Sequence, residues 1–222
     1  ALKEIIAERR FDFVGVKCHY DLSEHYVTQC LAAALCNDPY DWDGAKEPVV
    51  FSCEADSDGA LTMQVMKLVS GRPALFVDFR HYDAQEGVFV FCNCGAMATW
   101  YAERAEDPAA NLRSVHLCPI IPKYGGTGCH VQYVAREGLL TLGRLSRTLD
   151  RYKLTLFRGE VRRYPEAKLQ ETCPVWPHAF VRFAGDPEAL VDRYDSNHVH
   201  AVYGDHVAAL QKFAQLTAST AR

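Results

Sequence analysis

The sequence predicts an α/β fold, in which part of a doubly wound parallel α/β domain is followed by a β-rich antiparallel barrel-like domain. Two observations carry this prediction. In the first 85 residues, strand-like and helix-like segments alternate, which is typical of parallel layers. From residue 86 onward, β-prone runs follow one another without helices of comparable strength, which indicates antiparallel pairing. We therefore divide the chain into a partial α/β domain, 1–85, and a β-rich domain with a terminal helix, 86–222.

The first 48 residues should form a helix, a strand and a second helix. Apolar residues within 2–6 begin a short helix, and the run 11–18 is typical of a buried strand. Ser23 is expected to cap a helix in which apolar residues recur at spacings of three and four as far as Leu35. A turn-rich connection, 37–48, follows.

The stretch 49–83 is expected to organise the rest of the chain as a strand, a helix and a strand. Residues 49–53 form a short apolar run, and Asp56 begins the cap of a helix predicted for 61–69. Gly71 should end that helix before a second apolar run at 74–77. A right-handed crossover with two parallel strands fits this order.

Each of these two strands ends in a carboxylate, Glu54 or Asp78. Because parallel strands share one carboxyl edge, both acids should lie on the same rim of the sheet, where ligand crevices form. Strands lie about 5 Å apart, so the two carboxylates could share one cation or one substrate. The alternative is that they only cap the elements that follow or face solvent.

Six β-prone runs follow the first domain, and they occupy residues 87–92, 113–118, 129–134, 139–146, 152–157 and 178–183. Asp186 and Pro187 open a short helix that reaches Arg193. Residues 197–203 then predict another strand, and Asp205 caps a final helix.

Composition excludes several classes of protein. The net charge of −4 argues against a nucleic-acid partner, which would require a basic face. No apolar run approaches the ~20 residues needed to cross a bilayer, so no membrane partner is expected. The opening ten residues are amphipathic and lack the regions of a signal peptide. The chain opens in mid-pattern without an initiator Met, and we expect preceding sequence.

Nine cysteines are scattered through apolar contexts, an odd number that does not suit a disulfide scaffold. Buried thiols in a reducing, cytoplasmic location fit better. Cys92 and Cys94 have the wrong spacing for a zinc knuckle, and no C-x-x-C pair occurs. A structural zinc site is therefore not expected.

Three further stretches are candidate sites. The glycine-rich run 122–128 lacks the Lys-Ser/Thr of a P-loop, so a turn between strands is the better interpretation. His198 and His200 share one face of a predicted strand, which suits a metal, although an ordinary neutral role is also open for His198. Trp176, between two prolines, could stack on a sugar or simply pack in the core. No known serine or cysteine nucleophile motif is present.

An ordered set of motifs resembles the L-fucose isomerase and L-arabinose isomerase superfamily, and most closely its fucose isomerase-like branch. The motifs are SCEADSDGALTM around Glu54, LFVDFRHYD around Asp78, FCNCG at 91–95, GGTGCHVQYVAREG at 125–138 and NHVHAVYGD at 197–205. The resemblance covers essentially the whole chain but only the C-terminal half of a typical member.

This resemblance implies a divalent cation, usually Mn²⁺, held by Glu54, Asp78 and His198. Two hard carboxylates and one imidazole suit Mn²⁺, Mg²⁺ or another divalent cation better than a thiolate-seeking metal. Trp176 and Asn197 match positions at which family members contact the sugar. The resemblance also implies a homo-oligomer, a trimer or hexamer, and a small-molecule sugar substrate.

The reaction implied by the resemblance is aldose–ketose isomerisation of an L-fucose-like or arabinose-like sugar through a cis-enediol. The cation would act as a Lewis acid. Glu54 and Asp78 would serve as the general base and acid that move a proton between C1 and C2. Family members carry further N-terminal α/β domains, so we expect a C-terminal fragment of the full enzyme. The alternatives are a non-catalytic sugar- or metal-binding or assembly domain that keeps the isomerase fold, and an α/β plus β-barrel protein without a metal site.

Overall fold

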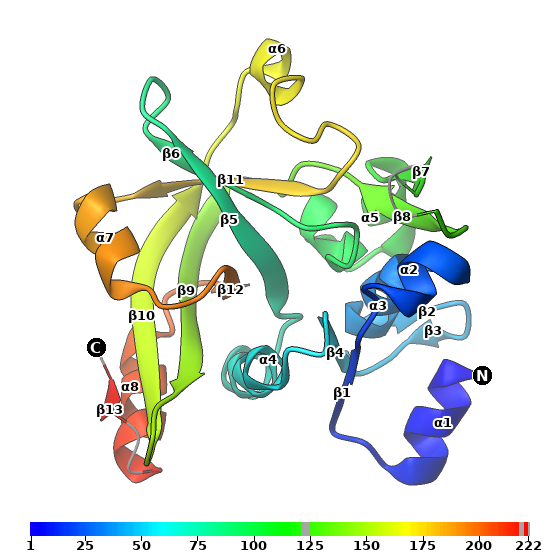
Figure 1. Ribbon diagram of the computed structural model, residues 1–222, viewed down its shortest axis with the longest axis horizontal. Coiled ribbons are helices and arrows are strands. Elements are labelled where there is room, and N and C mark those ends of the chain that lie inside the picture. The colour runs from blue at the N-terminus through cyan, green and yellow to red at the C-terminus, as the bar shows by residue number, and fades with distance from the viewer. Residues whose placement is uncertain (121–124, 218–219, 222) are drawn as a thin grey trace.

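The structure is a computed structural model that describes residues 1–120, 125–217 and 220–221. In chain order its elements are α1 (Leu2–Arg9), β1 (Phe13–Val16), α2 (Asp21–His25), α3 (Cys30–Asn37), β2 (Tyr40–Asp41), β3 (Gly44–Ala45), β4 (Val50–Cys53), α4 (Ser57–Ser70), β5 (Leu75–Asp83), β6 (Val88–Cys92), the 3₁₀ helix η1 (Thr99–Ala102), α5 (Pro108–Arg113), β7 (His116–Pro119), β8 (Cys129–Gln132), β9 (Gly138–Arg147), β10 (Tyr152–Val161), α6 (Glu166–Leu169), β11 (His178–Phe183), α7 (Pro187–Arg193), β12 (His198–Tyr203), α8 (Val207–Leu216) and β13 (Thr220–Ala221). Figure 1 shows α4 between the short pair β1–β4 and the long strands of a larger sheet.

The larger sheet is antiparallel and has the strand order β11-β6-β5-β12-β9-β10, to which β13 adds in parallel. Its longest ladder joins β9 to β10 over the range 138–161. The end strands β10 and β11 also pair, but only from Gly159–Val161 to Val181–Phe183. The fold is therefore mixed α/β, and the predicted antiparallel region is confirmed in part, as six antiparallel strands of this sheet. The contact between the end strands is too short to make a regular closed barrel.

The predicted parallel crossover is wrong, because strand β5 does not pair with β4. It lies between β6 and β12 in the antiparallel sheet. The reason is the short turn after it, in which Asp83 Oδ1 accepts hydrogen bonds from Gln85 N at 2.9 Å and Glu86 N at 3.1 Å. Gly87 completes the turn with a positive φ of 65°, so β5 and β6 form a hairpin, and hairpin strands are antiparallel.

The α/β character near the N-terminus rests on one parallel pair, in which β1 runs beside β4 with Phe13 opposite Val50 and Val16 opposite Cys53. Within residues 1–120, 125–217 and 220–221, the other parallel pair of named strands is β10–β13. A doubly wound parallel sheet therefore stays a prediction. The division between 1–85 and 86–222 also stays a prediction, although β5 shares a sheet with later strands.

The helix expected to run from Ser23 to Leu35 is instead two helices, α2 and α3, so this prediction is wrong. Its middle residues bond to the glycine-rich stretch: Thr127 N donates to Tyr26 O at 2.8 Å and Thr28 N donates to Thr127 O at 3.0 Å. These bonds replace the helical ones. Ser23 is not a cap, because it lies inside α2, where its Oγ donates to Tyr20 O at 3.4 Å. Within the glycine-rich run, 122–124 lie outside the described residues.

The ends of α4 and α7 follow the sequence signals closely, whereas α8 has His206 and not the predicted Asp205 at its N-cap. Asp56 Oδ1 accepts the Gly59 N–H at 2.9 Å and caps α4, which begins at Ser57, four residues before the predicted start. Gly71 ends α4 in the left-handed region with φ 67°. Asp186 caps α7 as predicted. The strand expected at 113–118 begins only at His116, because its first residue belongs to α5.

The core lies on both faces of the antiparallel sheet. One buried cluster is built around Leu140 and Leu142 of β9 with aromatic residues such as Tyr101, and a second packs Met63 and Met66 of α4 against the sheet and α8. These clusters fix α4, and with it the end of β4, against β9 and β12. Among the described helices, none is long and apolar enough to cross a membrane.

Candidate active site

The site begins at the point where β5 and β12 pair. His198 is the first residue of β12, and the ladder places it directly opposite Asp78 of β5. Directly paired residues in an antiparallel ladder have their β-carbons about 4.5–5.5 Å apart, so the two side chains start as neighbours. The sheet therefore joins two of the predicted ligands, although they are far apart in sequence.

Glu54 reaches the same place from the turn between β4 and α4. Glu54 and Ala55 both have left-handed backbones, with φ 59° and 55°. Such conformations cost non-glycine residues of order 1–3 kcal/mol and cluster at functional sites. The turn is held by the bond from Ala55 N to Val16 O at 3.1 Å and from Asp56 N to Cys53 O at 3.1 Å.

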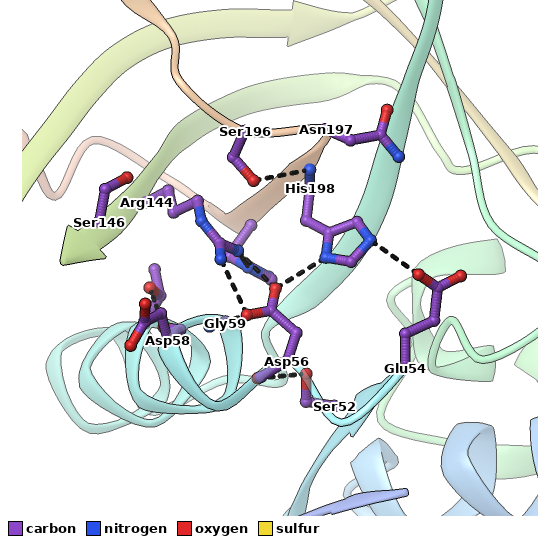
Figure 2. Close-up of polar contacts among 12 residues, drawn as sticks. Ser52, Glu54, Asp56, Asp58, Gly59, Arg144, Ser146, Ser196, Asn197 and His198 are labelled. Atoms are coloured by element: carbon purple, nitrogen blue, oxygen red, sulfur yellow. Dashed lines mark hydrogen bonds and ion pairs between the residues drawn. The ribbon is translucent and has the colours of Figure 1, made fainter. Parts of the chain in front are cut away.

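The three predicted ligands meet at the imidazole of His198. Its Nε2 lies 3.3 Å from Glu54 Oε2 and 3.4 Å from Asp78 Oδ1. Figure 2 shows the Glu54 carboxylate in front of one edge of the ring, with Asp56 at the other edge. His19 Nε2 approaches the second oxygen of Glu54 at 3.4 Å. The structure thus brings together Glu54, Asp78 and His198.

Asn197 also belongs to this cluster, whereas Trp176 lies beyond it. Asn197 Nδ2 donates a hydrogen bond to Asp78 Oδ1 at 3.0 Å. The Trp176 side chain is buried, and the guanidinium of Arg80 lies over its ring, 5.5 Å from the centroid. Trp176 lies in the connection before β11, and the residue of β5 that it contacts, Arg80, follows Asp78 by two positions. Sugar contact by Trp176 and Asn197 stays a prediction.

Sequence reasoning missed the roles of two residues behind His198, and it considered His200 only as a possible metal-binding neighbour of His198. Asp56, interpreted only as a helix cap, bonds His198 Nδ1 through Oδ2 at 2.7 Å. Arg144 of β9 binds the same carboxylate through both terminal nitrogens, at 2.5 and 2.8 Å. His200 Nε2 lies 3.2 Å from Arg144 Nη1. An acid two positions after Glu54 was a usable signal for Asp56, but nothing local in the sequence pointed to Arg144.

The charges in the cluster shift one another. Burial disfavours the cation of His198, but the hydrogen bonds with Asp56 and Glu54 outweigh it and raise the pKa of His198 to about 9. The same hydrogen bond from His198 lowers the pKa of Glu54. Burial raises the pKa of Asp78 to about 6. Burial also opposes ionisation of Asp56, yet the bonds from His198 and Arg144 hold its pKa well below the usual range.

A cavity of about 220 Å³ opens beside the cluster. Its lining includes Arg80, Cys92 and Thr172. Cys92 is the ladder partner of Asp78 on the side opposite His198, so the cavity reaches the residue next to Asp78, although Asp78 itself is not part of its lining. The arrangement combines paired carboxylates, an imidazole and a hollow, which are the parts needed for acid–base chemistry on a small molecule.

Comparison with known families decides what kind of domain this is. The model of the family described as "L-fucose isomerase, C-terminal domain" matches residues 91–219, more than half of the chain. The chain belongs to the L-fucose isomerase C-terminal domain family. The match includes Trp176, Asn197 and His198, whereas Glu54 and Asp78 precede it.

Relatives of this L-fucose isomerase-type domain carry the names of sugar isomerases. A sulfoquinovose isomerase of Alkalicoccus urumqiensis is 28% identical over 167 residues, which cover 75% of this chain and 34% of that protein. A sulfoquinovose isomerase of Priestia megaterium is 24% identical over 159 residues, or 71% of this chain and 32% of that protein. An L-fucose isomerase of Haemophilus influenzae strain PittEE is 25% identical over 236 residues, covering 84% and 39%. The chain spans about a third of the length of these curated relatives.

The donor set of this L-fucose isomerase-type domain fits a hard divalent cation in kind. Two carboxylates and one imidazole supply oxygen and nitrogen ligands without a thiolate. Metal-bound histidines usually donate their second N–H to a carboxylate, and His198 makes that contact with Asp56. In the described ranges, the side chains do not form a group of three or more His, Cys, Asp and Glu residues with the geometry to hold a metal ion. Glu54 and Asp78 contact His198 Nε2 instead.

Proposed function

We propose that the protein is the C-terminal part of a metal-dependent aldose–ketose isomerase. The observation that carries this proposal is the convergence of Glu54 and Asp78 on Nε2 of His198 beside a cavity. The sugar isomerases among the relatives support the reaction class. The three residues would hold Mn²⁺, Mg²⁺ or another divalent cation, which would supply Lewis-acid stabilisation of charge that develops on the sugar oxygens.

The proton chemistry falls to the two carboxylates. Isomerisation moves a proton between C1 and C2 of an open-chain sugar through a cis-enediol, and Glu54 and Asp78 would be the base and acid that carry it. Both carboxylates approach His198 Nε2, at 3.3 and 3.4 Å, so they would lie close to the same two neighbouring carbons. Asn197 holds Asp78 Oδ1, so it orients one of the two carboxylates and is a candidate sugar contact.

The substrate and setting complete the proposal. The sugar would be L-fucose-like or arabinose-like, and sulfoquinovose is a further candidate because relatives are named for it. The cavity of about 220 Å³, which is lined by Cys92, the ladder partner of Asp78, would receive the part of the sugar beyond C2. We also propose a cytoplasmic protein that assembles as a trimer or hexamer, without a nucleic-acid or membrane partner.

The test is ketose formation from L-fucose, L-arabinose and sulfoquinovose with added Mn²⁺. The protein is compared with Glu54→Gln and Asp78→Asn, which keep the side-chain shape but remove the charge. We expect each substitution to lower turnover by about 10²–10⁴-fold, the usual contribution of a general acid or base. Full activity in both variants would refute the assignment. Mn²⁺ binding without ketose formation would instead support a non-catalytic sugar- or metal-binding or assembly domain.

A further inference from the structure

The carboxylate of Asp56 is occupied on every side. Oδ1 accepts the Gly59 N–H at 2.9 Å and Arg144 Nη2 at 2.8 Å. Oδ2 accepts Arg144 Nη1 at 2.5 Å and contacts His198 Nδ1 at 2.7 Å. The backbone of the residue is tied as well, because Ser52 Oγ donates to Asp56 O at 2.9 Å. A carboxylate with this many donors cannot swing away from His198.

Arg144 is the anchor that reaches this carboxylate from the sheet. It extends from β9, its side chain is 11% exposed, and both of its terminal nitrogens donate hydrogen bonds to Asp56. Two parallel N–H···O bonds fix the plane of a carboxylate as well as its position. His200 Nε2, at 3.2 Å from Arg144 Nη1, supports the guanidinium from the neighbouring strand β12. Figure 2 shows Arg144 and His198 approaching Asp56 from different elements.

The His198 ring is held between this carboxylate and an aromatic neighbour. Its centroid lies 4.6 Å from that of Phe76 in a tilted arrangement, so packing limits rotation of the ring. With Nδ1 bound to Asp56, the other ring nitrogen, Nε2, is the one that faces Glu54 and Asp78. A hydrogen bond at one ring nitrogen sets which nitrogen is available to a metal.

We infer that Asp56 and Arg144 form a positioning pair that orients His198 so that Nε2, and not Nδ1, is presented to a cation. Neither residue belongs to the proposed ligand set, and Asp56 contacts that set through His198, so the pair would act through His198. This inference rests on the proposed function, because it assigns a task to residues behind the proposed cation site.

The shape of α4 at residue 59 supports the pair. A β-carbon there would lie 2.4 Å from Asp56 Oδ2 and 2.8 Å from His200 Nε2, both closer than real contacts allow. Only glycine leaves room for the carboxylate to reach Arg144 and His198 together. The close approach of the Asp56 carboxylate thus gives a local reason for glycine at position 59, in the first turn of α4.

The decisive variant is Asp56→Asn. The amide keeps the size of the carboxylate and one acceptor oxygen, but it replaces the other oxygen with an N–H₂ donor. That donor favours a bare Nδ1 and a proton on Nε2, the wrong form for a ligand. We expect Mn²⁺ to bind about 10- to 100-fold more weakly in calorimetry, the usual loss when the partner of a metal-bound histidine is removed.

The matched control is Asp107→Asn. Asp107 caps α5 through a bond from Ala109 N at 3.0 Å, so the substitution also changes a helix cap, but far from His198. Its Mn²⁺ dissociation constant should equal that of the unsubstituted protein. An unchanged constant in Asp56→Asn, with circular dichroism showing a folded protein, would overturn the inference. A loss in the control equal to that in Asp56→Asn would overturn it too, because a general cap effect would then explain both.

A second measurement covers the case in which Asp56→Asn does not fold. Long-range ¹H–¹⁵N spectra of the unsubstituted protein with saturating Mg²⁺ report the proton on each ring nitrogen of His198. We expect a proton on Nδ1 and none on Nε2, and the reverse would overturn the inference. The unsubstituted protein tests the proposed function separately. If it does not bind Mn²⁺, the proposed cation site is refuted. If it binds Mn²⁺ and Asp56→Asn binds equally well, only the positioning pair is refuted.

Discussion

Individual side chains settle what the cluster can do, and His198 is the residue on which the proposed metal chemistry depends. Its imidazole contacts both Glu54 and Asp78. We predict that His198→Ala abolishes measurable Mn²⁺ binding in calorimetry, because the remaining carboxylates lose the ligand between them. His116→Ala, at an exposed histidine of β7, is the control and should bind as before. Binding retained in His198→Ala would show that the cation sits elsewhere.

A second residue, Asp38, should make stability depend on pH. Its carboxylate is fully buried, accepts Thr99 Oγ1 at 2.7 Å and Trp100 N at 2.9 Å, and burial raises its pKa to about 7. The folded protein therefore binds the Asp38 proton more tightly than the unfolded chain, in which the pKa is about 3.9. The contribution is full below pH ~4, and the free energy of unfolding falls as pH rises from ~4 to ~7.

The measurement is urea unfolding across that pH window for the protein and for Asp38→Asn, whose amide does not titrate. In the variant, we expect the free energy of unfolding to fall less between pH ~4 and ~7 than in the unsubstituted protein. Equal slopes in both proteins would contradict the assignment to Asp38.

Elements show how far sequence signals reach. The strand at 49–53, the Asp56 cap and the Gly71 stop were predictable because caps and glycine turns act within a few residues. The pairing of β5 was not, since a parallel crossover and a hairpin place the same apolar run at the same residues. The gap between α2 and α3 was also hidden, because the bonds that interrupt the helix come from Thr127, a hundred positions away.

The end of α4 offers a test at the scale of an element. Gly71 has φ 67° and donates its N–H to Lys67 O at 2.8 Å, so it ends the helix in a conformation that other residues rarely adopt. Gly71→Ala should lower the free energy of unfolding by about 1–2 kcal/mol, the cost of a β-carbon in the left-handed region. Urea unfolding measures this. Gln211→Ala, on the exposed face of α8, is the control and should lose nothing. Equal stabilities of Gly71→Ala and the parent would contradict the role of this turn.

At the scale of the whole molecule, the antiparallel sheet carries the site. Glu54, Asp78 and His198 were found from motifs and a family resemblance, and the structure brings all three together. Arg144 escaped prediction because its partner lies 88 positions away and only the packed sheet joins them. Sequence spacing reports periodicity inside an element, whereas the neighbours of an element depend on the complete fold.

The core under the site should be as sensitive as any well-packed interior. Leu142, in the middle of β9, is fully buried beneath the strands that carry the cluster. Leu142→Ala should cost about 2–5 kcal/mol of unfolding free energy, through lost burial and the cavity left behind. Leu149→Ala, at a fully exposed leucine after β9, should change it by less than about 0.5 kcal/mol. Both are measured by chemical denaturation, and similar losses at the two positions would contradict the described core.

The register between β5 and β12 has a consequence for how the protein acquires its site. Asp78 and His198 face each other across a ladder that closes a loop of about 120 residues, so the two predicted ligands are far apart in the unfolded chain and become neighbours only after the sheet has formed. Long loops close late and at an entropic cost. A cation that binds only the closed ladder would stabilise it by mass action. During refolding, the time at which the protein begins to bind the cation would therefore report when these two strands pair.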